Sequence, residues 1–311
     1  MNDPLVSIII PTYNRAAIVT NAIKSVLEQT YQNFEILVVD DGSIDATQST
    51  LAKIKDKRVK LISASHGGAA AARNIGLKTA QGEYIGFCDS DDLWIASKLE
   101  LQINYFKQNP DVDLVFGDVV SLRGKKIETA SYFGERKPHA GHVFNQLLQY
   151  NFIPNVSVLV RKSCLDQIGY FNEELKTSED YELWLRFCLH YKVSYISEMV
   201  VQVLRHDGNI TMDDQTTYSN HLSVLDLMAK KFGTLISKSA LQKAYGRTYR
   251  NLTYSHILNR RWSQARTTIV QSFKHDSFSI ATWRYLFVLG LPINLLNALL
   301  DHRKRLRVSA C

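Results

Sequence analysis

The first ninety residues alternate between short apolar runs and amphipathic stretches. Residues 6–10 form a run dominated by β-branched side chains that stops at Pro11, which is typical of a strand covered on both faces of a parallel sheet. Apolar residues then recur at helical spacing up to Gln29. Further strands are expected at 34–39, 59–62 and 84–88, and helices at 46–54 and 69–80. This alternation predicts an α/β fold with a doubly wound, mostly parallel sheet.

The pattern beyond residue 110 is less regular. Strands are expected at 114–116, 156–160, 193–196 and 200–204, and helices at 180–190, 222–231, 240–258 and 262–273. No strand is expected after Thr211. We therefore expect an α/β domain over residues 1–212, a helical appendage over 213–278 and an amphipathic basic segment over 279–311.

Composition and cysteine spacing narrow the class of protein. The 311 residues are 45% apolar and 22% charged, as in globular chains. The four cysteines lie far apart without a CxxC pair, so neither a zinc site nor a disulfide framework is indicated, and a reducing cytosol is favoured. The apolar run near the N-terminus has no basic region before it and is too short for a signal peptide or a membrane span.

Charge is distributed unevenly along the chain. The net charge is +7, but the residues from Lys231 onward carry 14 Lys and Arg against only Asp276 and Asp301, a net of +12. The first 230 residues therefore carry 23 against 28, a net of −5. We expect the two parts to meet different partners.

Polar residues follow three of the predicted parallel strands. In open α/β sheets, ligands bind beyond the carboxyl ends of such strands. The residues at these ends are Thr12, Tyr13 and Asn14, then Asp40 and Asp41, then Asp89, Asp91 and Asp92. Carboxylates from different strands are expected to meet at one edge of the sheet.

The Asp89-Ser90-Asp91 turn suits a hard divalent cation. Its two carboxylates supply oxygen ligands for Mg²⁺ or Mn²⁺ and leave coordination positions open for a diphosphate, whose developing negative charge the ion would stabilise. The alternative is an acidic turn that caps a helix beginning near Leu93. A calcium EF-hand is disfavoured because Leu93 and Trp94 stand where that loop needs an oxygen ligand and a glycine.

Other motifs are less specific. Asp40-Asp41-Gly42-Ser43 is also an ordinary turn signal. Gly67-Gly68, followed by Arg73, would let the backbone approach a nucleotide, yet it matches neither the dinucleotide fingerprint nor a P-loop. His206 is a candidate metal or phosphate ligand, although a single histidine is more often structural or exposed.

Glu179 and Asp180 begin a predicted helix, where the helix dipole favours carboxylates. Thr177 with Asp180 approximates a capping box, which is a purely structural interpretation. The functional interpretation is a base within reach of an acceptor hydroxyl, a role that a carboxylate fulfils.

Taken in order, five segments resemble the family-2 glycosyltransferases over about the first 210 residues. They are VSIIIPTYNR, FEILVVDDGS, GGAAAARNIGL, GEYIGFCDSDD and SEDYELWLR. The resemblance implies a GT-A fold and an inverting transfer from a nucleoside-diphosphate sugar, with Mn²⁺ or Mg²⁺ as cofactor. It favours a UDP-sugar donor and a glycan or lipid-linked saccharide as acceptor, as in polysaccharide biosynthesis of the cell envelope.

The resemblance also assigns roles to individual residues. It places Pro11, Tyr13 and Asn14 in the nucleotide pocket, Asp40 at the base, Arg73 near the nucleotide, Asp89 at the ribose and metal, Asp91 at the metal, Asp92 at the sugar, and His206 as a third metal ligand. Asp180 is expected to be the catalytic base, with Glu179 as its neighbour. The QxxRW motif of processive synthases is absent, so polymer extrusion is disfavoured.

Three rival functions remain open from the sequence. A sugar-nucleotide pyrophosphorylase would need a Gly-rich loop with Arg and Lys where this chain has PTYNRAA. A nucleic-acid binder could use the basic C-terminus, although no recognition module is visible, so no nucleic-acid partner is expected. A non-catalytic nucleotide-sugar-binding protein is disfavoured by the intact Asp91 and Asp180.

The C-terminal segment has mixed character. Residues 283–300 are mostly apolar but contain Arg284, Pro292, Asn294 and Asn297, and residues 302–307 are strongly basic. A helix lying in the membrane interface, attracted to anionic lipid by ~1 kcal/mol per basic residue, fits better than a full span. The alternative is a buried terminal helix with a solvated tail. We expect a cytoplasmic protein that is peripheral on the inner face of the plasma membrane.

Overall fold

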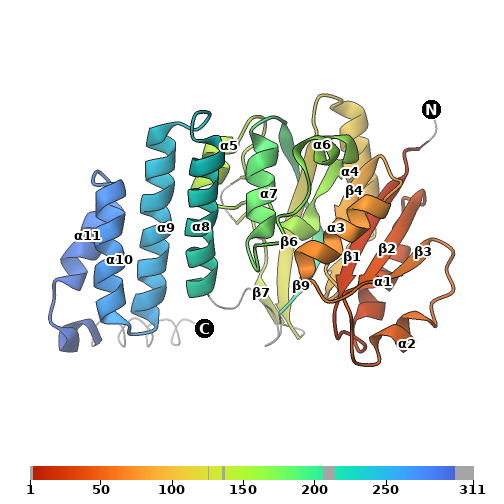
Figure 1. Ribbon diagram of the computed structural model, residues 1–311, viewed down its shortest axis with the longest axis horizontal. Coiled ribbons are helices and arrows are strands. Elements are labelled where there is room, and N and C mark those ends of the chain that lie inside the picture. The colour runs from red at the N-terminus through yellow and green to blue at the C-terminus, as the bar shows by residue number, and fades with distance from the viewer. Residues whose placement is uncertain (1–2, 125, 135–136, 206–213, 298–311) are drawn as a thin grey trace. The chain divides into compact units, whose positions relative to one another are not determined.

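The computed structural model describes residues 3–124, 126–134, 137–205 and 214–297 (Figure 1). The chain divides into two compact units. One comprises Met1–Leu147 and Asn151–Asn209, and the other comprises Leu148–Tyr150 and Ile210–Cys311. The boundary expected at residues 212 and 213 lies outside the described residues, as does His206.

The first unit is built on one sheet, whose strands run in the order β3-β2-β1-β4-β8-β6-β9-β5, with β7 paired to β6. Within the described residues, the strands are β1 (Val6–Thr12), β2 (Phe34–Asp40), β3 (Val59–Ser63), β4 (Tyr84–Phe87), β5 (Asp92–Trp94), β6 (Leu114–Arg123), β7 (Lys126–Thr129), β8 (Leu159–Arg161) and β9 (Val193–Leu204). All of them point the same way except β5, β7 and β8. The prediction of a mostly parallel sheet is therefore confirmed.

Helices cover both faces of this sheet. They are α1 (Val19–Leu27), α2 (Thr47–Leu51), α3 (Ala69–Thr79), α4 (Lys98–Gln108), α6 (Lys162–Ile168) and α7 (Glu179–Cys188), together with the 3₁₀ turn η1 (Asn155–Ser157). Successive side chains of a strand point to opposite faces, so Ile8 and Ile10 of β1 pack with α1 and α4, whereas Ile9 faces Gly76 of α3. A Cβ at Gly76 would lie 2.6 Å from Ile9 Cγ2, so α3 approaches the sheet there without a side chain.

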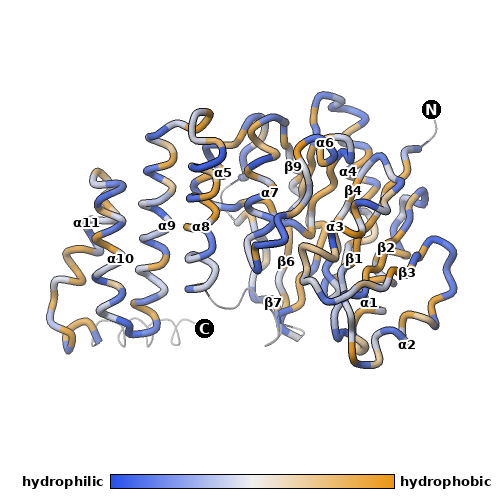
Figure 2. The backbone as a smooth tube through the Cα atoms, viewed as in Figure 1, coloured by the Kyte–Doolittle hydropathy of each residue, from blue (hydrophilic) through white to orange (hydrophobic). Residues whose placement is uncertain are grey.

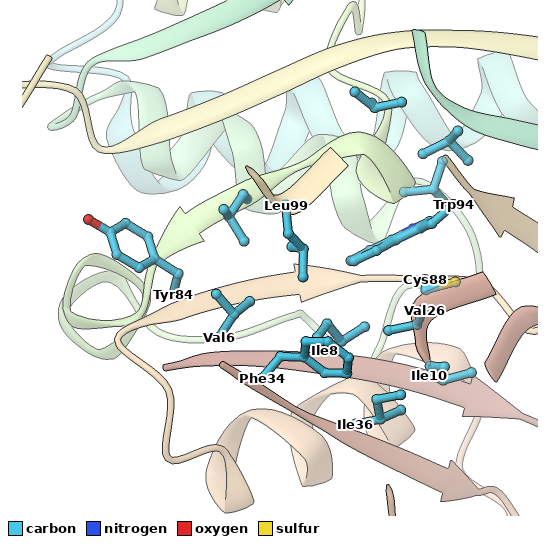
Figure 3. Packing of buried hydrophobic residues seen from close by; sticks show 14 of the residues in the cluster. Val6, Ile8, Ile10, Val26, Phe34, Ile36, Tyr84, Cys88, Trp94 and Leu99 are labelled. Atoms are coloured by element: carbon cyan, nitrogen blue, oxygen red, sulfur yellow. The ribbon is translucent and has the colours of Figure 1, made fainter. Parts of the chain in front are cut away.

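The main core lies between the sheet and the α1/α4 layer. Figure 3 shows Val6, Ile8 and Ile10 packed with Val26 of α1 and Leu99 of α4. Burial of each such aliphatic side chain stabilises the fold by about 1.5–3 kcal/mol relative to exposure. The apolar runs that predicted β1 and β2 therefore supply the strand side of this core, and the hydropathy along the backbone is shown in Figure 2.

Several elements differ from the prediction. No helix begins near Leu93. Instead, β5 pairs with β9 in antiparallel fashion, and α4 begins only at Lys98. The two strands expected at 193–196 and 200–204 are one strand, β9. The sequence pattern did not predict three helices, namely α4, α5 (Phe144–Gln149) and α6, or the strand β7.

The second unit is helical in its described part. It contains α8 (Asp214–Phe232), α9 (Lys238–Leu258), α10 (Trp262–His275) and α11 (Ile280–Leu289), and neighbouring helices pack in chain order (Figure 1). A small core joins α10 to α11 and the residues after it: Trp262, Ala265, Ile269, Leu289 and Leu296. None of the described helices is long and apolar enough to cross a membrane.

Candidate active site

The carboxyl ends of β1, β2 and β4 bring three of the predicted groups to one edge of the sheet. β1 and β2 are in register, so that Thr12 lies beside Asp40, and Ile9 of β1 lies beside Phe87, just before the acidic turn. The backbone N–H of Asp41 donates to Thr12 O at 2.9 Å. This bond connects the end of β1 to the first residue after β2.

Asp41 organises the loop between β3 and α3. Its buried carboxylate accepts hydrogen bonds from the backbone N–H groups of Gly67 at 2.8 Å and Gly68 at 2.9 Å. One of its oxygens also lies 2.9 Å from His66 Nδ1. The imidazole of His66 stacks on the half-exposed ring of Tyr13, with ring centroids 4.2 Å apart. This loop is therefore held against the end of β1.

Asp40 is 2% exposed, and only one of its oxygens is used within the described part of the chain. Oδ1 accepts from the backbone N–H of Ser43 at 3.2 Å, whereas the buried Oδ2 has no hydrogen-bond partner there. A buried acceptor without a donor costs free energy, which a ligand N–H would recover. This geometry suits the base-binding role expected of Asp40.

Asn14 has a structural part in the site. It adopts a left-handed backbone with φ of 53°. Its N–H donates to Ser43 Oγ at 2.8 Å, and its Oδ1 accepts from the N–H of Ile44 at 2.9 Å. Asn14 thus ties the loop after β1 to the loop after β2, while Pro11 lies within β1 itself.

Arg73 links the acidic turn after β4 to the start of α7. The guanidinium is 6% exposed and donates to Asp89 Oδ1 and Glu179 Oε1, each at 2.7 Å. Burial acts to lower the pKa of Arg73, but the two carboxylates outweigh burial and raise it above its usual value. The cation is therefore permanently charged, and it joins residues from α3, the end of β4 and the start of α7.

Asn74, the next residue of α3, holds the segment that leads into α7. Its amide donates to Phe171 O at 2.9 Å and to Glu173 Oε1 at 2.7 Å, and it accepts from the N–H of Phe171 at 2.9 Å. Arg73 and Asn74 together place the beginning of α7 beside the acidic turn.

Asp180 lies in the first turn of α7, partly buried. Its Oδ1 accepts from the N–H of Tyr181 at 2.7 Å, and its Oδ2 accepts from Asn151 Nδ2 at 3.4 Å. Burial and the neighbouring charge of Glu179 raise the pKa of Asp180 to about 7, although the N–H of Tyr181 and the charge of Arg73 act in the opposite direction. A carboxylate with such a pKa is suited to accept a proton near neutral pH.

The capping-box interpretation of this turn does not describe the start of α7. The N-cap residue is Ser178, which has a left-handed backbone, and its side chain accepts no capping hydrogen bond. The carboxylate of Asp180 instead contacts Tyr181 N and Asn151.

The remaining residues of the acidic turn differ from one another in environment. Asp91 Oδ2 lies 3.7 Å from Arg15 Nη2. Asp92 is buried at the start of β5, where its Oδ1 accepts from the N–H of Leu204 at 3.3 Å. Burial, with the charges of Asp89 and Asp91, raises the pKa of Asp92 well above its usual value.

The acidic turn fits a hard cation by its chemistry, but it is not a complete protein cage. Within the described residues, no group of three His, Cys, Asp or Glu side chains is placed to hold a metal ion. Asp89 and Asp91 offer oxygen donors of the kind that Mg²⁺ and Mn²⁺ prefer. The third expected ligand, His206, lies outside the described residues.

Side chains that the sequence analysis did not single out also contact the predicted site residues, among them His66, Arg15 and Asn151. Arg15 follows the predicted Asn14, and His66 precedes the Gly67-Gly68 pair. Asn151 lies in an irregular segment, where the sequence carries no signal for its contact with Asp180.

Comparisons with known proteins identify the family and the fold. The model of glycosyl transferase family 2 matches residues 7–169. The E. coli UDP-Glc:alpha-D-GlcNAc-diphosphoundecaprenol beta-1,3-glucosyltransferase WfgD is 37% identical over 198 residues, which cover 63% of this chain and 75% of WfgD. An uncharacterized glycosyltransferase from Rickettsia conorii is 37% identical over 224 residues, covering 70% of this chain. This chain spans only 36% of that relative's length.

Solved structures share the fold. S. aureus TarS (residues 1–349) in complex with UDP-GlcNAc aligns with a TM-score of 0.67 at 20% identity, covering 91% of this chain and 90% of TarS. The mannosyltransferase PcManGT from Pyrobaculum calidifontis, in complex with GDP-Man and Mn²⁺, aligns with a TM-score of 0.60 at 16% identity, covering 93% and 87%. The expected GT-A fold is confirmed.

Proposed function

Because the chain belongs to glycosyl transferase family 2, we propose that it is an inverting glycosyltransferase that moves a sugar from a UDP-sugar to a hydroxyl group of a glycan or lipid-linked saccharide. The observation that carries the proposal is the Arg73 bridge, which brings Asp180, with a pKa raised to about 7, to the side of the acidic turn. A proton acceptor and a diphosphate-binding turn are the two groups that such a transfer requires.

The donor binds through residues at the ends of β1, β2 and β4. In this proposal, the unpaired Oδ2 of Asp40 accepts an N–H of the nucleobase, and the ring of Tyr13 lies against the base. Pro11 and Asn14 shape the loop that carries Tyr13. Asp89 and Asp91 hold the metal ion, and Asp92 contacts the sugar. A bound Mg²⁺ or Mn²⁺ supplies electrostatic stabilisation of the diphosphate leaving group.

Transfer is a single displacement. The carboxylate of Asp180 accepts the proton of the acceptor hydroxyl as that oxygen forms a bond to the anomeric carbon. The bond from the anomeric carbon to the diphosphate breaks, the nucleoside diphosphate leaves, and the configuration inverts. Asn151 and the N–H of Tyr181 orient the carboxylate, and the Arg73–Glu179 pair fixes the start of α7.

The preference for UDP and for a lipid-linked acceptor is supported by relatives. WfgD is named for a UDP-glucose donor and a diphosphoundecaprenol-linked acceptor, and TarS forms a complex with UDP-GlcNAc. A lipid-linked acceptor places the enzyme beside a membrane. We therefore include in the proposal a cytoplasmic enzyme that is peripheral on the inner face of the plasma membrane.

A panel of nucleotide sugars tests the proposal, with binding and slow donor hydrolysis measured in the presence and absence of Mn²⁺. We expect metal-dependent binding of one UDP-sugar. Asp91→Asn should abolish metal-assisted turnover, whereas Asp180→Asn should keep donor binding and lose transfer. If no nucleotide sugar in the panel shows metal-dependent binding or hydrolysis, the proposal is contradicted. Donor binding without turnover would indicate the non-catalytic alternative.

A further inference from the structure

The outward face of α11 is apolar where a helix facing water is normally polar. At 100° per residue, Ile280, Trp283, Arg284, Phe287 and Val288 share one side of α11, and all of them are exposed. The opposite side carries Thr282 and Leu289, which are buried against the rest of the helical unit. Four of the five outward residues are therefore apolar.

The exposure of this face is extensive. Phe287 is 77% exposed and Trp283 is 55% exposed, and Phe278, just before the helix, is 96% exposed. Ile293 and Leu295, just after α11, are exposed as well, and hydrophobic positions recur along this part of the chain (Figure 2). Exposed aromatic and aliphatic side chains that gather in one short stretch of the chain are typical of an interaction surface. We call these seven residues (Phe278, Ile280, Trp283, Phe287, Val288, Ile293 and Leu295) the α11 face.

Trp283 is held in place on this face. Its Nε1–H donates to Ser277 O at 2.8 Å, and its ring meets Phe273 edge to face with centroids 5.0 Å apart. The indole is thus preorganised, and its polar atom is satisfied within the protein. Tryptophan side chains are enriched at the boundary between water and lipid.

Charge identifies the occupant. The described residues 214–297 contain 11 Lys and Arg against 3 Asp, a net of +8, and Arg284 lies on the α11 face side of the helix. A second copy of the chain would bring two such charges together, which is unfavourable. An anionic lipid surface instead attracts the basic residues while it accepts the aromatic side chains.

We propose that the α11 face docks the protein onto an anionic lipid bilayer, with Phe278, Trp283 and Phe287 inserted at the interface. The membrane contact is thus made by folded residues of the helical unit and does not depend on the basic residues 302–307 alone. This inference rests on the peripheral membrane location included in the proposed function and names the surface that makes the contact, whereas its observations come from the helical unit and not from the site of sugar transfer.

The test uses the full chain with vesicles of phosphatidylcholine, with and without phosphatidylglycerol, and no nucleotide sugar. Trp94, Trp184 and Trp262 are buried, so Trp283 is the exposed member of the four tryptophans. We expect sedimentation with the anionic vesicles, weakened by salt, and a blue shift of tryptophan emission. Trp283→Phe should keep binding and lose most of the blue shift.

Phe287→Ser and Ile280→Ser should each weaken vesicle binding, Phe287→Ser by about tenfold. The matched control is Leu235→Ser, since Leu235 is 63% exposed in the same unit but outside the α11 face. All three sites are exposed, so the variants should melt as the wild type does. If Phe287→Ser binds vesicles as strongly as the wild type does, the inference is overturned. It is also overturned if the wild type does not bind vesicles.

Self-association that Phe287→Ser abolishes would also overturn it, because a second copy would then cover the face. Sedimentation equilibrium without lipid measures this outcome. A chain that binds vesicles but transfers no sugar keeps this inference and loses the proposed function. Transfer to a soluble acceptor without vesicle binding keeps the proposed sugar transfer but overturns this inference and the peripheral membrane location.

Discussion

Arg73 and Glu179, 106 positions apart in the sequence, are joined by a hydrogen bond of 2.7 Å between buried or nearly buried side chains. The same guanidinium reaches Asp89, so the end of β4 and the start of α7 share one cation. Because one planar group makes both contacts, the position of the proposed base depends on a residue that need not touch the acceptor.

Arg73→Lys should lose at least one of these two contacts, since an ammonium group cannot reproduce the forked geometry of the guanidinium. We expect kcat to fall by at least about tenfold, corresponding to ~1.4 kcal/mol of barrier. Initial-rate kinetics measure the effect. Arg58→Lys is the control, because Arg58 makes a similar forked contact to Asp56 away from the site. Equal loss in both variants would show a general effect of the substitution.

The pH dependence of transfer reports the base. The carboxylate of Asp180 accepts a proton only when ionised, and its pKa is raised to about 7. We therefore expect kcat/KM to rise with pH and to level off above about 7. Asp180→Asn should remove this dependence and reduce turnover by ~10²–10⁴-fold on the plateau. A profile that levels off near pH 4 would exclude Asp180 as the titrating group.

The same carboxylate affects stability. Its pKa is higher in the folded state than the ordinary value of 3.8, so the folded state binds the proton more tightly. The stability due to protonated Asp180 is fully present below pH 3.8 and is lost as the pH rises to about 7. Asparagine cannot ionise. The stability of Asp180→Asn relative to the wild type should therefore increase between pH 5 and pH 8, as urea denaturation without ligand would show. A constant difference would contradict the raised pKa.

The unpaired oxygen of Asp40 predicts a defect in donor binding. Asp40→Asn retains the size of the side chain but lets an NH₂ group replace the buried acceptor Oδ2. We expect the donor Kd to increase by about tenfold or more, as loss of one buried hydrogen bond costs ~1–3 kcal/mol. Calorimetric titration measures the change, with the exposed Asp111→Asn as control. Unchanged affinity would remove Asp40 from the base-binding role.

The close approach of Gly76 to Ile9 leads to a prediction about stability that does not involve the candidate active site. A methyl group there meets the rigid, buried Ile9 at 2.6 Å. Overpacking of this kind costs ~1–3 kcal/mol, more than the helix propensity that alanine gains. Gly76→Ala should lower the melting temperature, whereas Lys78→Ala, exposed on the same helix, should not. A melting temperature for Gly76→Ala at or above the wild-type value would contradict the close approach.

The parts of the fold that follow from local pattern were predictable. β1, β2 and β3 were found within two residues of their ends because their apolar runs are bounded by turn residues. α4 was missed because its buried side carries Lys98 and Gln102, which disguise the apolar stripe. In the structure, the ammonium of Lys98 is satisfied by Gln102 Oε1 at 2.7 Å and lies 4.2 Å from the centroid of the Trp94 ring.

Other features depend on tertiary contacts. β9 appeared as two strands because Ser197, Glu198 and Met199 in its middle are exposed, where its register with β6 shifts. The acidic turn, the PTYN loop and Glu179–Asp180 were identified by motif order. The Arg73 bridge, the Asn151–Asp180 contact and the His66–Tyr13 stack join residues distant in sequence, so no local pattern predicts them.

The hold of Asn74 on Phe171 and Glu173 also bears on how such enzymes can be recombined. The proposed donor-binding residues come from the first 92 positions. The proposed base lies on a later stretch of the chain that Arg73 and Asn74 of α3 hold by hydrogen bonds. A hybrid that takes residues 171–188 from a relative must therefore present glutamates that match Arg73 and Asn74 of α3. The segment that carries the proposed base can thus be exchanged between relatives only together with the α3 residues that hold it.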